Sequence, residues 1–384
     1  MRRIYVAPSH KTEGMTTSSS SSSIRSTLLR HQRAIDTALR ATLDTVTNPA
    51  LTPYYGYMRY HLGWVDTDLT PTSNNPGKLL RPTLLLLAYE AAGAWGLANE
   101  GEDTRYLQRA LPAAVSVELT HNFTLIHDDI EDGDIERRHR PTMWKLWGIP
   151  HAINTGDGMF ALARLALWNV VRNGVDGDLA VRLGEALDRA SFVLAEGQYL
   201  DISFETRLDI SIVMYLDMIR RKTAALMGCA AEMGARLGTP NQETIDRLQQ
   251  FGQAMGLAFQ VRDDLLGIWA TSEESGKTPA GDIYRRKKSL PVLHALEHAS
   301  PSDQQVLRTI YQQTTPVTLA QVEQIQAIFE RTQTQAYCRQ FLTTYCQQAH
   351  EILTSIPHHS SPVSARALND LETLVHFVEE ATRA

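Results

Sequence analysis

The longest proline-free stretch of the chain, residues 151–239, constrains the fold more than any other feature. The chain has 16 prolines elsewhere, and a proline inside a helix removes a backbone hydrogen bond and clashes with the preceding turn. Apolar residues within the stretch recur at helical spacing, as at Leu183, Leu187, Ala190 and Leu194. No alternating apolar and polar run is bounded by Asn-Gly or Asp-Gly turns, so no strands are predicted. The sequence therefore predicts an all-α fold, a single large bundle of mostly antiparallel helices.

The N-terminus differs in composition from the rest of the chain. Ser18 to Ser23 form an unbroken serine run, and such polar sequence cannot bury enough apolar surface to offset its ordering entropy. We predict a disordered tail over residues 1–25 and one helical domain over residues 26–384. Two alternatives are a true translation start at Met15 and a targeting peptide, although the usual apolar segment of such a peptide is missing.

Composition and charge argue against several classes of protein. The formal net charge of −6 argues against a nucleic-acid partner held by bulk positive charge. The most apolar stretch, residues 79–98, is interrupted by Arg81, Pro82 and Glu90, so no transmembrane segment is predicted. The 3 cysteines include no CxxC pair, which indicates a reducing compartment. We predict a soluble cytoplasmic protein.

A first acidic cluster lies in the segment LIHDDIED, residues 125–132. Asp128 and Asp132 are four residues apart, so a helix projects both carboxylates from one face, with Asp129 beside them. Taken alone, such a cluster is most simply a solvated helix face. The alternative is a site for Mg²⁺, a hard cation that prefers carboxylate oxygens and is often shared with substrate phosphates.

A second cluster favours the metal site. The segment FQVRDDLL, residues 259–266, repeats an apolar run followed by two acids, Asp263 and Asp264. Two such faces that oppose one another across a bundle could hold Mg²⁺ between them. Basic residues stand near both clusters and between them: Lys78, Arg81, Arg137, Arg138, Lys222, Lys277 and Lys287. Together these charges predict a cavity that binds diphosphates, both through Mg²⁺ and through direct charge-assisted hydrogen bonds.

An ordered set of motifs runs from Lys78 to Pro291: GKxxRP, HDDxxD followed by Arg-Arg, KT, GQxxD and FQxxDD. This set resembles the trans-isoprenyl (polyprenyl) diphosphate synthase family, in particular its short-chain geranylgeranyl and farnesyl diphosphate synthases. The resemblance implies the helical bundle of the type I isoprenoid synthases, with a central catalytic cavity, in a homodimer. It also implies a prenyltransferase that joins isopentenyl diphosphate to an allylic diphosphate by ionisation, condensation and elimination.

The resemblance assigns roles to the charged residues. Asp128, Asp132 and Asp263 resemble ligands of Mg²⁺, expected as three ions, with Asp129 and Asp264 beside them. The residues that resemble the clamp on the allylic diphosphate are Arg137, Lys222, Lys277 and Lys287. Those that resemble the isopentenyl diphosphate pocket are Lys78, Arg81, His121 and Arg138. Thr223 and Gln260 would turn oxygens toward the carbocation, and the released pyrophosphate would take the proton.

Three positions depart from the family pattern. Gly267 stands where the second motif usually ends in an aspartate, so we expect one metal ion to be held less tightly. His139 and Arg286 stand where glycine is usual, which could shift the turn at His139 and add charge at the cavity mouth.

Product length follows from the wall below the first motif. Phe123 lies five residues before Asp128, roughly one and a half helical turns deeper. An aromatic residue there, next to the small Thr124, resembles geranylgeranyl synthases, with farnesyl synthases as the second choice. Phe123→Ala should then lengthen the product. Two alternatives stay open: a terpene cyclase on the same scaffold, and a catalytically weak regulatory subunit of a prenyl synthase.

Overall fold

The structure is a computed structural model that describes residue 24 and residues 26–72, 77–98, 104–270, 279–357 and 361–380. Almost all of the predicted tail and the proposed clamp residue Lys277 lie outside these ranges. The longer helices are α2 (Gln32–Asp44), α3 (Thr52–His61), α4 (Leu80–Ala91), α5 (Leu111–Glu131), α7 (Ile149–Leu167), α8 (Gly177–Phe204), α9 (Ile212–Ile219), α10 (Ala225–Gly238), α11 (Gln242–Trp269), α14 (Leu290–His298), α15 (Pro301–Gln312), α16 (Leu319–Arg331), α17 (Thr334–Thr354) and α18 (Pro362–Glu379). The short ones are η1 (Pro49–Leu51), η2 (Ala94–Gly96), η3 (Arg105–Arg109), α6 (Met143–Trp147), η4 (Trp168–Asn173), the π-helix η5 (Arg220–Ala224) and α13 (Gly281–Tyr284).

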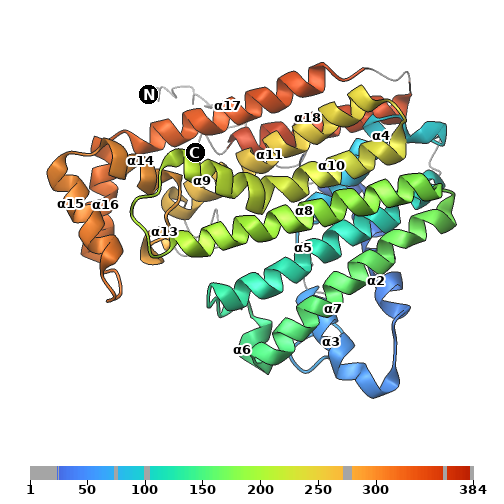
Figure 1. The fold of residues 1–384 in the computed structure, drawn as a ribbon, viewed down its shortest axis with the longest axis horizontal. Coiled ribbons are helices and arrows are strands. Elements are labelled where there is room, and N and C mark those ends of the chain that lie inside the picture. Colours follow the sequence, from blue (N-terminus) through green and yellow to red (C-terminus); the bar gives the residue numbers. More distant parts are fainter. Residues whose placement is uncertain are drawn as a thin grey trace, which may run out of the picture.

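Long helices packed side by side form the body of the molecule (Figure 1). Helix α10 packs against α4, α8 and α11, while α5 packs against α7 and α11 against α17. The proline-free stretch 151–239 holds α7, α8, α9 and α10 with short connections, as the sequence predicts. The prediction of an all-α fold is confirmed. No helix within the described ranges is long and apolar enough to cross a membrane.

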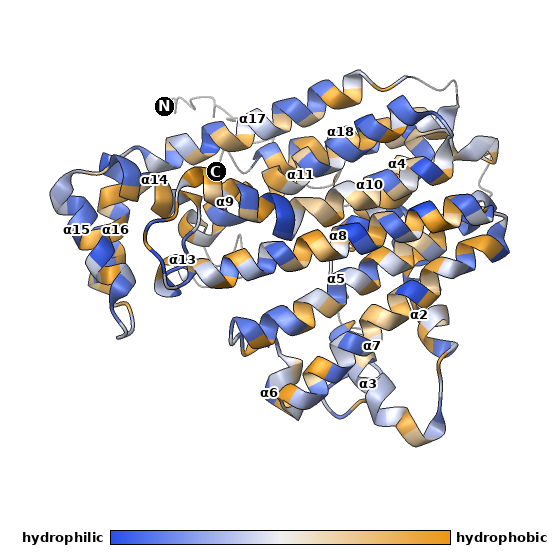
Figure 2. Cartoon of the chain, viewed as in Figure 1, coloured by the Kyte–Doolittle hydropathy of each residue, from blue (hydrophilic) through white to orange (hydrophobic). Residues whose placement is uncertain are grey.

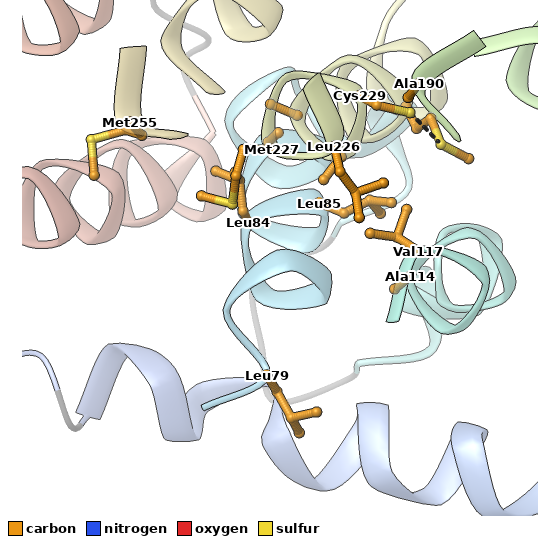
Figure 3. Close-up of a cluster of buried hydrophobic side chains, with 14 of the residues drawn as sticks. Leu79, Leu84, Leu85, Ala114, Val117, Ala190, Leu226, Met227, Cys229 and Met255 are labelled. Atoms are coloured by element: carbon orange, nitrogen blue, oxygen red, sulfur yellow. Dashed lines mark hydrogen bonds between the residues drawn. The ribbon is translucent and has the colours of Figure 1, made fainter. Parts of the chain in front are cut away.

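The core lies where α4, α5 and α10 meet. Figure 3 shows side chains of the three helices together, among them Leu84 and Leu85, Val117, and Leu226 and Met227. All five are almost completely buried, and each such side chain contributes about 1.5–3 kcal/mol relative to an exposed one. A smaller apolar cluster joins α13, α14, α15 and α16 at one end of the bundle. The prediction of one domain over residues 26–384 stays a prediction.

One small hairpin corrects the prediction that the chain has no strands. Strand β1 (Glu136–Arg137) pairs antiparallel with β2 (Arg140–Pro141) directly after the first acidic cluster. The two turn residues, Arg138 and His139, have φ angles of 53° and 59°, the left-handed conformation that such a turn requires. Because neither residue is the glycine or asparagine that usually marks this turn, the sequence pattern did not reveal it.

Candidate active site

A cavity of about 970 Å³ brings the two acidic clusters together. Asp128 and Asp132, at the C-terminal end of α5, line it together with Asp263 of α11. Lys222 of η5 and Lys287, which follows α13, line the same cavity. Its apolar lining includes Leu125, Phe204, Met218 and Ile219. Residues from sequence positions far apart thus surround one space that carries both carboxylates and ammonium groups.

The first acidic cluster is held by two basic residues. Arg137 Nε donates to Asp129 Oδ1 at 2.6 Å, and Lys222 Nζ donates to Asp128 Oδ1 at 3.0 Å. Burial raises the pKa of the Asp129 carboxyl to about 6, although the Arg137 guanidinium acts in the opposite direction. Burial, followed by the neighbouring Asp128 carboxylate, raises the pKa of Asp132 to about 7. The cluster therefore concentrates negative charge that a cation in the cavity would stabilise.

Lys222 owes its position to a close approach of α8. A Cβ added to Gly197 of α8 would lie 2.2 Å from the backbone nitrogen of Lys222, so only glycine lets the two elements approach this closely. Four residues along α8, Asp201 Oδ2 accepts a hydrogen bond from Lys222 Nζ at 2.6 Å. Burial lowers the pKa of Lys222, but Asp128 and Asp201 outweigh it and raise that pKa, so the ammonium stays protonated. Asp201 is the last residue of the GQxxD motif, and the sequence alone does not indicate its role.

The two acids of the second cluster differ in surroundings. Asp263 lines the cavity, whereas Asp264 is 1% exposed and surrounded by protein donors. Tyr215 and Gln260 both donate to its carboxylate, as does the Leu290 backbone N–H at 3.3 Å. Lys287 Nζ lies 3.6 Å from Asp264 Oδ1. Burial raises the pKa of Asp264 to about 6. Asp264 therefore connects α9, α11 and α14 from within the protein.

Thr223 and Gln260, which are predicted to turn oxygen atoms toward the carbocation, line the cavity. Thr223 Oγ1 donates to Gln260 Oε1 at 2.9 Å, and Gln260 Nε2 donates to Asp264 Oδ1 at 3.1 Å. This chain of hydrogen bonds orients both side chains.

The predicted isopentenyl diphosphate residues gather beside the first cluster. Arg81 Nη1 lies 3.0 Å from His121 Nε2, and Arg138 shares a small pocket with Arg137 and Asp129. Burial, followed by the neighbouring guanidinium groups, lowers the pKa of His121 well below its usual value, which keeps the ring neutral. Lys78 Nζ lies 5.8 Å from the ring centroid of Phe377 in α18.

His61 of α3 was not foreseen from the sequence. It lines the small pocket that holds Arg137 and Arg138, and burial together with these guanidinium groups lowers its pKa. It belongs to none of the motifs, so no sequence signal indicated it.

Phe123 lies on a different face of α5 from the cavity-lining residues. Its ring packs edge-on against Phe160 of α7, with 4.9 Å between the ring centroids, and against His127. Leu125, which shares a helix face with Asp128 and Asp132, lines the cavity instead. Among the described residues, no three His, Cys, Asp or Glu side chains converge closely enough to hold a metal ion by themselves.

The sequence model of the polyprenyl synthetase family matches residues 63–330. The chain belongs to this family. The motif-based assignment, and with it the prediction of a trans-prenyltransferase, is thereby confirmed. The (2E,6E)-farnesyl diphosphate synthase of Mycobacterium tuberculosis H37Rv is 42% identical over 255 residues, which span 66% of this chain and 67% of that protein. A geranylgeranyl diphosphate synthase of the same organism is 39% identical over 269 residues, 70% of this chain and 72% of that protein.

Solved structures of the family share the fold. A polyprenyl synthetase from Streptomyces coelicolor A3(2) has a TM-score of 0.80 and 33% identity, covering 92% of this chain and 99% of that chain. A geranylgeranyl pyrophosphate synthetase from Pyrococcus horikoshii has a TM-score of 0.78 and 30% identity, covering 93% and 98% of the two chains.

Proposed function

We propose that the chain condenses isopentenyl diphosphate with an allylic diphosphate to give a short-chain all-trans prenyl diphosphate. The observation that carries the proposal is the single cavity into which Asp128, Asp132 and Asp263 extend together with Lys222 and Lys287. The farnesyl and geranylgeranyl diphosphate synthases among the relatives support the same reaction.

Magnesium fits the donor set of this cavity. Asp128, Asp132 and Asp263 offer hard carboxylate oxygens. Burial, followed by the neighbouring Asp128 carboxylate, raises the pKa of Asp132, and a divalent cation in the cavity would favour its charged form. Because no three acidic side chains of the described residues converge, the diphosphate of a substrate would have to complete each coordination sphere. We propose three Mg²⁺ ions, which when bound would neutralise charge on the departing diphosphate.

The chain's own residues bind and orient the substrates. Lys222, Lys287 and Arg137 clamp the allylic diphosphate, and carboxylates near both lysines raise their pKa values and keep them charged. The C1–O bond of the allylic substrate breaks and its electron pair leaves with pyrophosphate. Thr223 and Gln260 present oxygen dipoles to the allylic cation, while the apolar lining excludes water.

The second substrate occupies the adjoining basic pocket. Lys78, Arg81, Arg138 and the neutral His121 hold isopentenyl diphosphate there. Its C4 carbon forms the new bond to C1 of the allylic cation, and the proton lost in the elimination goes to the released pyrophosphate.

We propose geranylgeranyl diphosphate as the product, with farnesyl diphosphate as the second choice. Phe123 lies outside the cavity lining, and its contact with Phe160 would block a chain that grew past Leu125 between α5 and α7. Phe123→Ala should therefore lengthen the product, and Leu125→Ala should do so by widening the cavity itself. Mass spectrometry of the products checks both, and an unchanged profile for Phe123→Ala would remove Phe123 from this role.

We also propose a homodimer formed through α7 and α8. Figure 2 shows apolar residues along both helices, and several are exposed, with Leu165 of α7 at 59% and Phe192 of α8 at 68%. An apolar surface of this kind commonly marks a protein interface.

We also propose a cytoplasmic location. The three cysteines are unpaired and buried, which is consistent with a reducing compartment.

One assay tests the proposed reaction. Purified protein is incubated with Mg²⁺, isopentenyl diphosphate and dimethylallyl, geranyl or farnesyl diphosphate, and the products are identified by mass spectrometry. Elongated diphosphates support the proposal. Cyclic hydrocarbons would point to a terpene cyclase, and absence of turnover to a regulatory subunit. Asp263→Asn should abolish most of the activity, whereas Asp303→Asn, at an ion pair with Arg331 outside the cavity lining, serves as the control.

A further inference from the structure

Gly267 lies one helical turn after Asp263 on α11, where the second motif of the family usually has its last aspartate. The space beside it is already filled. A Cβ added to Gly267 would lie 2.4 Å from Oδ2 and 2.6 Å from Cγ of Asp282. The carboxylate of Asp282 therefore occupies the space into which a side chain at position 267 would extend.

Asp282 is placed to act in the cavity. It lies in α13, is 6% exposed, and lines the cavity together with Asp263. Its backbone oxygen accepts a hydrogen bond from the Lys287 N–H at 2.9 Å, so one turn positions both the acid and the clamp lysine. The ion pair between Arg285 Nη2 and Asp282 Oδ1 spans 3.8 Å, and the arginine side chain is 55% exposed, so this pair is weak.

We propose that Asp282 supplies the third carboxylate of the second acidic cluster and replaces the acid that is missing at Gly267. This inference rests on the proposed magnesium-dependent function. It revises the expectation that one metal ion is held less tightly, because an acid from a separate segment restores the charge at the same place. Gly267 and Asp282 then form a matched pair: the glycine leaves the room that the distant carboxylate needs.

The test is metal binding in the presence of a diphosphate rather than turnover. Free Mn²⁺ is measured by electron paramagnetic resonance while the full chain is titrated with Mn²⁺ at saturating inorganic pyrophosphate. The variants are Asp282→Ala, Asp282→Asn, Gly267→Asp and the double variant Gly267→Asp/Asp282→Ala. Asp303→Ala removes a half-buried carboxylate, paired with Arg331 and outside the cavity lining, and is the matched control. Thermal unfolding of each variant shows whether it is folded.

We expect that the metal-binding role of Asp282 can be moved to an aspartate at position 267. Asp282→Ala and Asp282→Asn should weaken the affected Mn²⁺ site by about 10- to 100-fold, while Asp303→Ala leaves it unchanged. Gly267→Asp alone should lower the melting temperature, because two carboxylates would compete for one space. The double variant should recover Mn²⁺ affinity to within about threefold of wild type, since the removed side chain makes room for an acid on α11.

Two results would overturn the inference. One is wild-type Mn²⁺ affinity in folded Asp282→Asn, which would limit Asp282 to holding the turn at Lys287. The other is a folded double variant that binds Mn²⁺ no better than Asp282→Ala. If the wild-type chain itself bound no Mn²⁺ with pyrophosphate, the proposed function would fail, and this inference with it.

Discussion

The two adjacent acids of the second cluster should respond to mutation in opposite ways. Asp263 lines the cavity, whereas Asp264 accepts hydrogen bonds from Tyr215 and the Leu290 backbone and lies beside Lys287. We expect loss of Asp264 to lower the stability of the protein, and loss of Asp263 to lower its affinity for metal ions.

The contacts of the Asp264 carboxylate determine how much stability its removal should cost. Asp264→Ala leaves a buried hydroxyl, a backbone N–H and an ammonium group without their acceptor, and removing one partner of a buried ion pair costs about 3–5 kcal/mol. Because Lys287 is 35% exposed and can turn toward water, we expect about 3 kcal/mol. Asp264→Asn keeps one acceptor oxygen and should cost about 1–2 kcal/mol. Asp263→Asn changes a side chain that lines the cavity, and it should cost less stability than Asp264→Ala.

Urea denaturation and Mn²⁺ binding with pyrophosphate distinguish the two roles. Asp264→Asn should be less stable than wild type while it binds Mn²⁺ within about threefold of wild type, and Asp263→Asn should show the reverse. The activity of Asp264→Asn should still fall, because Gln260 and Lys287 lose the carboxylate that orients them. An Asp264→Asn variant of wild-type stability with strongly reduced Mn²⁺ affinity would refute this reasoning and make Asp264 a direct ligand.

Three further outcomes are expected. Phe192→Glu, on the exposed face of α8, should convert a dimer to a monomer in sedimentation experiments, whereas Leu319→Glu, at the exposed first residue of α16, should not. An unchanged mass of the Phe192→Glu variant would exclude this face of α8 as the dimer interface. His139→Gly should raise the free energy of unfolding by about 0.5–1 kcal/mol by relieving a left-handed conformation, and a lower melting temperature would contradict this. Burial lowers the pKa of His294 to about 4, so the unfolded chain takes up its proton first as the pH falls. The free energy of unfolding should thus fall by up to about 3 kcal/mol as the pH is lowered from about 6.5 to 4. A His294→Gln variant whose stability depends on pH in the same way would show that other groups cause this loss.

The helical fold was predictable because its signals are local. A helix brings residues three and four positions apart onto one face, so the spacing of apolar residues in the stretch 151–239 and the spacing of Asp128 and Asp132 are visible in the sequence. The order of the motifs likewise led to the family, which the comparison with relatives confirms. The hairpin at Arg138 was missed because its turn lacks the residues that usually mark one.

The sequence by itself determined which segments form helices, which chemical groups they carry and which family the chain belongs to. Only the tertiary structure decided which groups meet. Asp263 and Asp264 are neighbours in sequence, yet one lines the cavity and the other is buried among donors from α9, α11 and α14. The contact between Gly267 and Asp282 is equally absent from any local pattern. The physical reason is that backbone geometry orients a side chain relative to its own helix, whereas its partners depend on how separate helices pack.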